Sequence, residues 1–393
     1  MKIAILTSSF PLDPDDPAAA AGLFVRDFAV ALAQQHCEVH VVTQDKGFGC
    51  KNPPDEIDVH CYGWGGGDKA LSQLKLYNPF DLAKASQLIA GARKKLIRLH
   101  DQHNFDHVLA MWAVPAGLTA SQLKSARNVP YSVWCLGSDI WTYGKIPVLR
   151  SIVAKVIRGA SHRFADGMQL GEDASELSGQ TIDFLPSSRK LPKLDFDALT
   201  LKGSTPRFLF VGRYSHVKGI DVLIKAFAHF RERHQSGSLY LLGGGPLRNS
   251  IVNQVEVHHL QDSVFVGGYA NAETVVRYGK ACDAFVIPSR NESIPVVLSD
   301  AVQLGKPVIV TDVGDMGKIV ADTTSGIVVP PEDPESLAEA LQTFAKSANL
   351  EFENGVKELS SRFDVSETAK IFLQKIKTIN DSSEASLSLE SVQ

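Results

Sequence analysis

The sequence lacks the marks of a secreted or membrane-spanning protein. It has five cysteines in 393 residues and no Cys-x-x-Cys pair, so reduced thiols are expected rather than a disulfide framework. No apolar stretch approaches the ~20 residues of a membrane span. The amino-terminal apolar run in MKIAILTSSF is too short for a signal peptide. We expect a cytoplasmic protein that touches a membrane only peripherally, at its inner face.

Three further classes of protein are disfavoured by what is missing. The formal net charge of −4 gives no basic footprint for nucleic-acid binding. No Gly-x-Gly-x-x-Gly follows the first predicted strand, which argues against a dinucleotide-dependent dehydrogenase. No spacing typical of metal ligands is visible. The adjacent His258 and His259 do not form a metal-binding motif. We therefore expect no metal site and no bound cofactor.

The pattern that is present predicts an α/β protein of two domains. The length suits two cores, and 44% hydrophobic and 21% charged residues are typical of a globular chain. Apolar runs alternate with amphipathic segments, which predicts two doubly wound, Rossmann-like parallel-sheet domains facing a cleft. We expect an N-terminal domain at 1–186, a linker at 187–206, a C-terminal domain at 207–379 and a disordered tail at 380–393. The predicted strands are 2–8, 38–44, 107–114, 131–137, 165–170, 207–212, 238–245, 263–268, 283–288, 307–312 and 326–331, and the predicted helices include 23–35, 219–233, 294–304, 334–346 and 366–378.

The stretch 283–312, DAFVIPSRNESIPVVLSDAVQLGKPVIVTD, predicts a strand, a polar turn, a helix and a second strand. Ser293 is a candidate N-cap, with Pro295 in the first helical turn. Glu292 lies beside the helix N-terminus, whose free N–H groups attract anions such as a diphosphate, and Asp300 follows about two turns later. Both carboxylates can accept hydrogen bonds from sugar or ribose hydroxyls. The alternative is an ordinary capped helix with two solvated acids.

A positively charged loop follows the first strand of the second domain. In VGRYSHVKG, Arg213 and Lys218 lie at the carboxyl end of that strand, where a guanidinium and an ammonium suit a diphosphate. Such cations stabilise the charge that a leaving diphosphate gains during sugar transfer. The alternative is a solvated basic turn.

A glycine-rich loop, GGGPLR, follows the next strand. Gly243 and Gly245 allow a ligand to approach the backbone closely. A turn before a proline-initiated helix also needs glycine, so this signal is weak alone.

Candidate acceptor-side residues follow strands of the first domain. Ser138 and Asp139 are expected at the rim of the cleft. Trp112 ends another strand and could stack on a sugar face, although such a tryptophan is more often part of the core.

Together these motifs resemble the retaining glycosyltransferases of family 4, which have the two-domain GT-B fold and use nucleotide sugars. Arg213 and Lys218 match a G-R-x-x-x-x-K-G turn, and 243–248 matches a G-x-G-P-L-R strand end. Glu292 and Asp300 match a Glu-x7-Glu motif, with Asp in place of the second Glu. The resemblance covers most of the chain, and the order and spacing of three motifs make it specific.

The resemblance implies a role for each matched residue. Arg213 and Lys218 would bind the donor diphosphate, Glu292 would contact the donor sugar, and Asp300 would bind the ribose. The first-domain loop containing Gly22 resembles the family's glycine pair, with alanine at the first position, and would lie over the diphosphate. The implied catalytic residues are Arg213, Lys218 and Glu292; the implied donor-binding residues are Gly22, Gly243, Gly245, Ser293, Ile294 and Asp300; the acceptor-side residues are Trp112, Ser138 and Asp139.

Two departures from the family pattern matter. Asp300 is one methylene shorter than the usual Glu. Leu136-Gly137 replaces a His-Gly that lies at the reacting end of the site in many members. Retaining transfer tolerates this loss if the leaving phosphate takes the acceptor proton on the same face of the sugar.

The implied function is transfer of a hexose from a nucleoside diphosphate sugar to a hydroxyl of a glycan or lipid-linked acceptor, in cell-surface polysaccharide or glycolipid synthesis. The N-terminal domain would bind the acceptor and the C-terminal domain the nucleotide sugar, without a metal. Two alternatives stay open. One is a sugar-nucleotide epimerase on a similar fold, and the other is a catalytically silent nucleotide-binding subunit, which Leu136 favours.

The segment 145–163 predicts a basic amphipathic helix. It has no acidic residue, and Arg150, Lys155 and Arg158 fall largely opposite its apolar side. Such a helix either lies on an anionic membrane surface or packs on the core with a solvated basic face.

Overall fold

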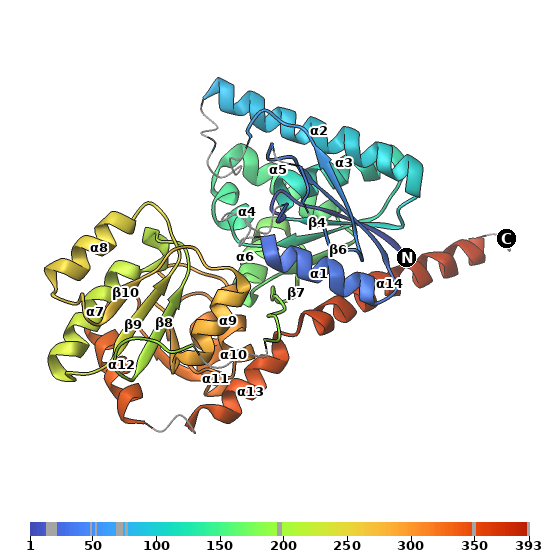
Figure 1. Cartoon of the computed structure of the whole chain (residues 1–393). Coiled ribbons are helices and arrows are strands. Elements are labelled where there is room, and N and C mark those ends of the chain that lie inside the picture. The colour runs from blue at the N-terminus through green and yellow to red at the C-terminus, as the bar shows by residue number, and fades with distance from the viewer. Residues whose placement is uncertain are drawn as a thin grey trace. The chain divides into compact units, whose positions relative to one another are not determined.

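The computed structural model describes residues 1–12, 22–47, 49–51, 53–67, 74, 78–194, 199–347 and 351–390, with side chains up to residue 377. The chain forms two compact units. The first comprises Met1–Ser187 together with Val365–Gln393, and the second comprises Ser188–Asp364. Each unit contains one parallel sheet flanked by helices (Figure 1). The two-domain α/β prediction is therefore confirmed, while the predicted cleft between the domains stays a prediction.

The first unit has a seven-stranded sheet in the order β3-β2-β1-β4-β5-β6-β7, with every strand pair parallel. Strands β4 and β5 are buried along their whole length, as expected where helices cover both faces of a parallel sheet. The strands are β1 Lys2–Leu6, β2 Glu38–Gln44, β3 Asp58–Tyr62, β4 His107–Met111, β5 Tyr131–Cys135, β6 His162–Ala165 and β7 Asp183–Phe184. The helices are α1 Leu23–Gln34, α2 Pro79–His103, α3 Leu118–Arg127, α4 Ser138–Trp141, α5 Pro147–Gly159, α6 Met168–Ser178 and α14 Val365–Glu390.

The last helix of the chain, α14, returns to the first unit and lies beside α1 (Figure 1). Phe372 is fully buried, with its ring 5.7 Å from that of Phe28 on α1 and 5.6 Å from that of Phe164 on β6. This apolar packing explains why the segment does not belong to the second domain, where its position in the sequence placed it. The helix continues to Glu390, through most of the tail that was expected to be disordered.

The second unit has a six-stranded parallel sheet in the order β10-β9-β8-β11-β12-β13. Among the helices of this unit, α7 packs against α12, and α13 packs against α10 and α11. The strands are β8 Arg207–Val211, β9 Ser238–Leu242, β10 Val264–Val266, β11 Ala284–Ile287, β12 Val308–Thr311 and β13 Gly326–Val329. The helices are α7 Ile220–Arg233, α8 Arg248–Val257, α9 Ala272–Ala281, α10 Val296–Gln303, α11 Met316–Thr323, α12 Pro334–Lys346 and α13 Glu353–Arg362.

Two local predictions differ from the structure. The strand expected at 165–170 is wrong, because β6 ends at Ala165 and α6 begins at Met168. The linker expected to begin at 187 already belongs to the second unit from Ser188. Among the described residues, no helix is long and apolar enough to cross a membrane.

Candidate functional site

The candidate site lies where the strand order of the second sheet changes direction. Strands β8 and β11 are neighbours in the sheet but far apart in the sequence. The β8–α7 loop carries Arg213 and Lys218, and the β11–α10 loop carries Glu292. Because the carboxyl ends of parallel strands meet at one sheet edge, such a switch point is where open α/β sheets bind ligands.

Lys218 and Glu292 meet at this edge. The Lys218 Nζ donates a hydrogen bond to the Glu292 Oε2 and forms an ion pair with it. Each side chain is 20% exposed, so the pair is reachable from solvent. The backbone of Glu292 is fixed by Gly314 in the β12–α11 loop, where a Cβ would lie only 2.0 Å from the Glu292 carbonyl oxygen. Two of the three predicted catalytic residues therefore touch, on loops held by the sheet.

The third predicted catalytic residue, Arg213, is exposed. Its guanidinium makes no hydrogen bond or ion pair with any residue that the structure describes. A free guanidinium on the same loop as the Lys218 ammonium gives this edge a capacity for anions with several oxygens.

The amino terminus of α10 adds free backbone donors. Pro295 is its N-cap residue, and no side chain caps the first turn. The prediction that Ser293 is the N-cap is therefore wrong. The Ser293 Oγ is buried without a hydrogen-bond partner among the described residues, and Ile294 is 3% exposed. An uncapped helix start favours a negatively charged ligand.

Arg290 joins the two loops that carry the predicted catalytic residues, a role that the sequence motifs did not reveal. Its guanidinium donates to the carboxylate of Asp221 on α7 at 2.7 and 2.8 Å and also pairs with Glu332. It further donates to the carbonyl of His216 at 2.6 Å, and its backbone N–H donates to the carbonyl of Val217 at 2.8 Å. Arg290 also lowers the pKa of the Asp221 carboxyl through these hydrogen bonds. The β8–α7 and β11–α10 loops are thus held in one arrangement.

The glycines of GGGPLR allow two loops to touch each other. Gly243 has φ +152°, and a Cβ on it would lie 1.9 Å from the Gly212 carbonyl oxygen. Gly245 has φ +149°, and a Cβ there would lie 2.6 Å from the Tyr214 carbonyl oxygen. Both positions need glycine because the β9–α8 loop packs on the β8–α7 loop. Their contribution to a ligand site is therefore indirect, through the position of the loop that carries Arg213.

Asp300 is buried in α10 and already has a partner. Arg189 donates to its two carboxylate oxygens from Nε at 2.7 Å and from Nη2 at 2.5 Å. Both side chains are almost fully buried. Gln303, one turn later on α10, donates from Nε2 to the Arg189 carbonyl at 2.8 Å. A ribose could use Asp300 only by displacing a bidentate guanidinium. The sequence missed this pair because Arg189 lies in the segment taken as a linker.

Two predicted residues of the first unit are constrained by the backbone, Trp112 by its own conformation and Gly22 by a close neighbour. Trp112, at the end of β4, has φ +72°, and its half-buried ring packs edge-on against Phe24 at 6.4 Å. A positive φ is unfavourable for a residue with a side chain, and such strain is concentrated at functional sites. Gly22 is the N-cap residue of α1, and a Cβ on it would lie 2.9 Å from the Cα of Phe10. Its partner in the predicted glycine pair lies outside the described residues.

Asp139 corrects a prediction. It was expected at the rim of the cleft, but it is 0% exposed. Its carboxylate accepts hydrogen bonds from the backbone N–H of Ala113 at 2.9 Å and of Leu136 at 3.3 Å. Burial raises the pKa of this carboxyl, while the backbone hydrogen bonds oppose that shift. Asp139 therefore ties together the loops that follow β4 and β5, and only its neighbour Ser138 is exposed.

Two family models match the chain. The model described as "Glycosyl transferases group 1" matches residues 193–358, and the model described as "Glycosyl transferase 4-like" matches residues 18–165.

Relatives with similar sequences are glycosyltransferases. MJ1178 of Methanocaldococcus jannaschii, named as a glycosyltransferase, is 32% identical over 267 residues, which are 67% of this chain and 72% of MJ1178. TuaC of Bacillus subtilis, a glycosyltransferase assigned to teichuronic acid biosynthesis, is 26% identical over 337 residues, which are 79% of this chain and 82% of TuaC.

Solved structures share the fold. A sucrose-phosphate synthase from Thermosynechococcus elongatus aligns with a TM-score of 0.76 at 21% identity, covering 97% of this chain and 100% of that one. Anabaena HepE in complex with UDP-glucose aligns with a TM-score of 0.70 at 18% identity, covering 97% and 100%. These two structures are similar to this chain in architecture.

Proposed function

Because the chain belongs to the group 1 glycosyl transferases and has a GT-B fold of two Rossmann-like domains, we propose that it is a retaining enzyme that moves a hexose from a nucleoside diphosphate sugar to a hydroxyl acceptor. The observation that carries this proposal is the Lys218–Glu292 pair at the β8/β11 switch point. A cation and a hydrogen-bond acceptor side by side suit a ligand with a diphosphate next to sugar hydroxyls.

In this mechanism the cations act on the leaving group. When the bond between the sugar carbon and the diphosphate breaks, negative charge grows on the phosphate oxygen. Lys218, Arg213 and the free N–H groups at the start of α10 would stabilise that charge from fixed positions. Glu292 would accept a hydrogen bond from a donor-sugar hydroxyl and orient the reacting carbon. The diphosphate would be bound without a metal ion.

The acceptor proton would leave through the departing phosphate. The new bond from the acceptor oxygen to the sugar carbon forms on the face from which the phosphate departs, and the acceptor proton passes to a phosphate oxygen. Leu136 offers no base at the position after β5, and the Asp139 oxygens accept backbone N–H groups. The first unit would therefore bind and position the acceptor, with Trp112 and Ser138 as candidate contacts.

We propose a glycan or lipid-linked acceptor in cell-surface polysaccharide or glycolipid synthesis. The relation to TuaC, assigned to teichuronic acid biosynthesis, supports a polymeric acceptor. Helix α5 supports contact with an anionic membrane, because Arg150, Lys155 and Arg158 are exposed on it. At its start, Ile146 is 43% and Val148 72% exposed, so apolar side chains accompany the basic ones.

The experiment is a thermal-shift screen of the purified protein with UDP, GDP, ADP and their common sugar conjugates. HepE binds UDP-glucose in its solved structure, so UDP conjugates are tested first. A nucleotide at a hundred times its Kd should add about 2.7 kcal/mol to the free energy of unfolding. We expect a shift with one base that is lost in Arg213→Ala and kept in Lys225→Ala, an exposed control on α7.

Two results would contradict the proposal. If no nucleotide raised the melting temperature, the protein would have no binding site for a nucleotide-sugar donor. Conversion of the donor sugar to an isomer without any acceptor would identify an epimerase instead of a transferase.

A further inference from the structure

A cluster of histidines and acids lies in the first unit, outside the residues of the proposed transfer reaction. Glu38 and His40 are two residues apart on β2, so both side chains point to the same face of the sheet. Asp58 and His60 repeat this arrangement on the neighbouring strand β3, where Asp58 is paired in register with His40. His103 is the last residue of α2, which packs on this face. Three elements thus converge on one point.

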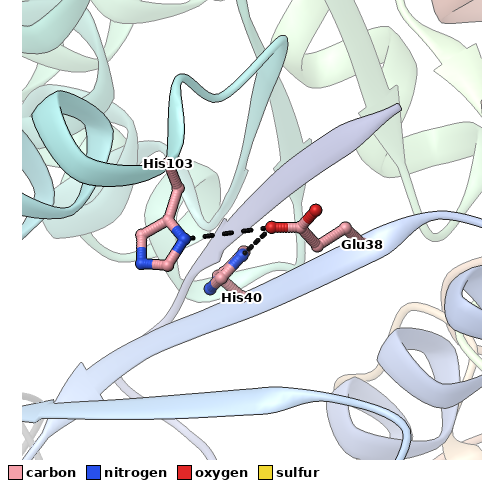
Figure 2. A group of neighbouring side chains, drawn as sticks. All are labelled: Glu38, His40 and His103. Carbon is pink, nitrogen blue, oxygen red and sulfur yellow. Dashed lines mark hydrogen bonds and ion pairs between the residues drawn. The ribbon is translucent and has the colours of Figure 1, made fainter.

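Three ligand-type atoms of this cluster point toward one another (Figure 2). The His40 Nε2 lies 3.0 Å from the Glu38 Oε1, and the His103 Nδ1 lies 3.8 Å from the same oxygen. All three atoms lie within 4.8 Å of one another. In a tetrahedral zinc site with bonds of about 2.1 Å, neighbouring ligand atoms are about 3.4 Å apart. Side-chain movements of about 1 Å would bring these atoms to that spacing.

The surroundings of His40 prepare its Nε2 to be a ligand. On the other side of the ring, Nδ1 lies 3.0 Å from the His60 Nε2 and 3.6 Å from the Asp58 Oδ2. The Asp58 carboxylate can only accept, so it favours a proton on Nδ1, which would leave a lone pair on Nε2. Metal-binding histidines are held in this way by a partner on the second ring nitrogen. At 3.0 Å from the Glu38 Oε1, the Nε2 either donates its own N–H to this oxygen or, with its proton on Nδ1, shares a bound metal ion with it.

The local charges suit a cation and leave the ligand atoms free. His103 lies at the carboxyl end of α2, where the helix dipole favours positive charge. Lys2 pairs with the other oxygen of Glu38, Oε2, at 3.3 Å, so Oε1 stays directed at the two histidines. His40 is 1% exposed, whereas His103 and Glu38 are 33% and 43% exposed. A cation can therefore enter from solvent and reach a buried ligand.

We propose that Glu38, His40 and His103 bind one divalent transition-metal ion, of which zinc is the best match. Two imidazoles and a carboxylate are the ligand types of zinc sites, with water as a fourth ligand. His60 and Asp58 act as positioning residues for His40. The site lies toward the amino ends of β2 and β3, whereas substrates of parallel sheets bind at the carboxyl ends. Its role is therefore to fasten the end of α2 to the sheet.

The experiment measures zinc binding to the untagged, chelator-treated protein by competition with a chromophoric chelator. We expect one zinc ion per chain. His103→Phe keeps a ring to stack on Phe105 but removes the nitrogen, and Glu38→Gln keeps the size but removes the charge. Each should weaken zinc binding by at least about 100-fold, while His60→Ala should weaken it about 10- to 100-fold. The control His259→Asn, at an exposed histidine with φ +53°, should change nothing.

A second readout separates metal binding from general destabilisation. Cobalt(II) in the wild-type protein should give the visible absorption of a four-coordinate ion, and His103→Phe should lose that absorption while keeping its circular dichroism. Absence of stoichiometric zinc in the wild-type protein would show that a proton bridges His40 and Glu38, and would overturn the proposal. Equal affinity in the wild-type, His103→Phe and Glu38→Gln proteins would overturn it as well.

Discussion

Arg189 and Asp300 form a bidentate ion pair with side chains 8% and 2% exposed. Removing one partner of a buried pair leaves the other charge without compensation, which costs about 3–5 kcal/mol. We expect Arg189→Met to lower the free energy of unfolding of the second unit by this amount in urea titrations. The matched control is Arg277→Met, because Arg277 pairs with Glu273 at the surface and should cost less than about 1 kcal/mol. Equal losses in the two variants would contradict a structural role for the buried pair.

Burial of His107 makes the free energy of unfolding depend on pH. This residue is fully buried in β4, where burial lowers its pKa to about 3, and its Nε2 lies 2.7 Å from the Ser132 Oγ. In the unfolded chain this histidine binds a proton near pH 6.5, whereas in the folded protein it stays neutral down to about pH 3. Protonation of the unfolded state therefore lowers the free energy of unfolding as the pH falls from 6.5 toward 3, and has little effect at neutral pH. Between pH 7 and pH 5 the loss should be about 2 kcal/mol.

The measurement compares wild-type protein with His107→Gln in urea at pH 7 and pH 5. Gln can still bond to Ser132 but does not titrate. The wild-type protein should lose about 2 kcal/mol more than the variant between the two pH values. The same loss in both proteins would show that other groups, such as His162, carry the acid sensitivity.

Helix α5 shows how one element can serve the core and a surface together. Val153, Val156 and Ile157 are buried, as expected of the alternative in which the helix packs on the core. Lys155 and Arg158 are exposed between these positions. Core packing therefore accounts for the amphipathic pattern, and the membrane role depends on the exposed basic side and on Val148.

Vesicle sedimentation tests the membrane role of α5. Changing Arg150, Lys155 and Arg158 to Gln should reduce co-sedimentation with anionic vesicles, because each basic residue near such a surface contributes about 1 kcal/mol. The control changes three exposed lysines of the second unit, Lys225, Lys318 and Lys346, to Gln. It removes the same net charge and should leave sedimentation nearly unchanged. No sedimentation of the wild-type protein, or equal losses in both variants, would reject the membrane role.

Apolar runs predicted most elements, because buried parallel strands are continuous hydrophobic segments. The edge strand β3 was missed, since its residues, DVHCY, alternate partly buried polar and apolar side chains. The sequence placed Lys218 and Glu292 on loops at the carboxyl ends of two strands. That the two side chains form a pair depends on β8 and β11 being neighbours in the sheet, and no local sequence pattern predicts strand order. The burial of Asp139 depends on packing between the loops after β4 and β5, which are distant in the sequence.

The metal-type cluster had a sequence signal that was not used. Glu38-x-His40 and Asp58-x-His60 each place an acid and a histidine on one face of a strand. Their meeting with His103 required the pairing of β2 with β3 and the end of α2. The spacing of histidines and acids along a single segment would not have shown that these residues meet.

At the scale of the whole molecule, the chain starts and ends in the same unit. The second unit is a continuous segment, Ser188–Asp364, and α14 then completes the first unit through Phe372. The second unit contains Arg213, Lys218 and Glu292 together with the uncapped start of α10. These residues, which are proposed to act on the donor, therefore all lie in the second unit. Single substitutions in that unit can test the donor site without changing residues of the first unit.

The most direct test of the central claim is the rate of sugar transfer by Lys218→Ala, with the donor selected in the thermal-shift screen. The account predicts that kcat/KM falls at least about 100-fold, because a cation fixed at the leaving diphosphate is lost. Lys225→Ala should stay within about 2-fold of wild type, and both variants should keep the wild-type urea midpoint. Wild-type transfer rates in folded Lys218→Ala would contradict the assignment of the Lys218–Glu292 edge as the site of glycosyl transfer.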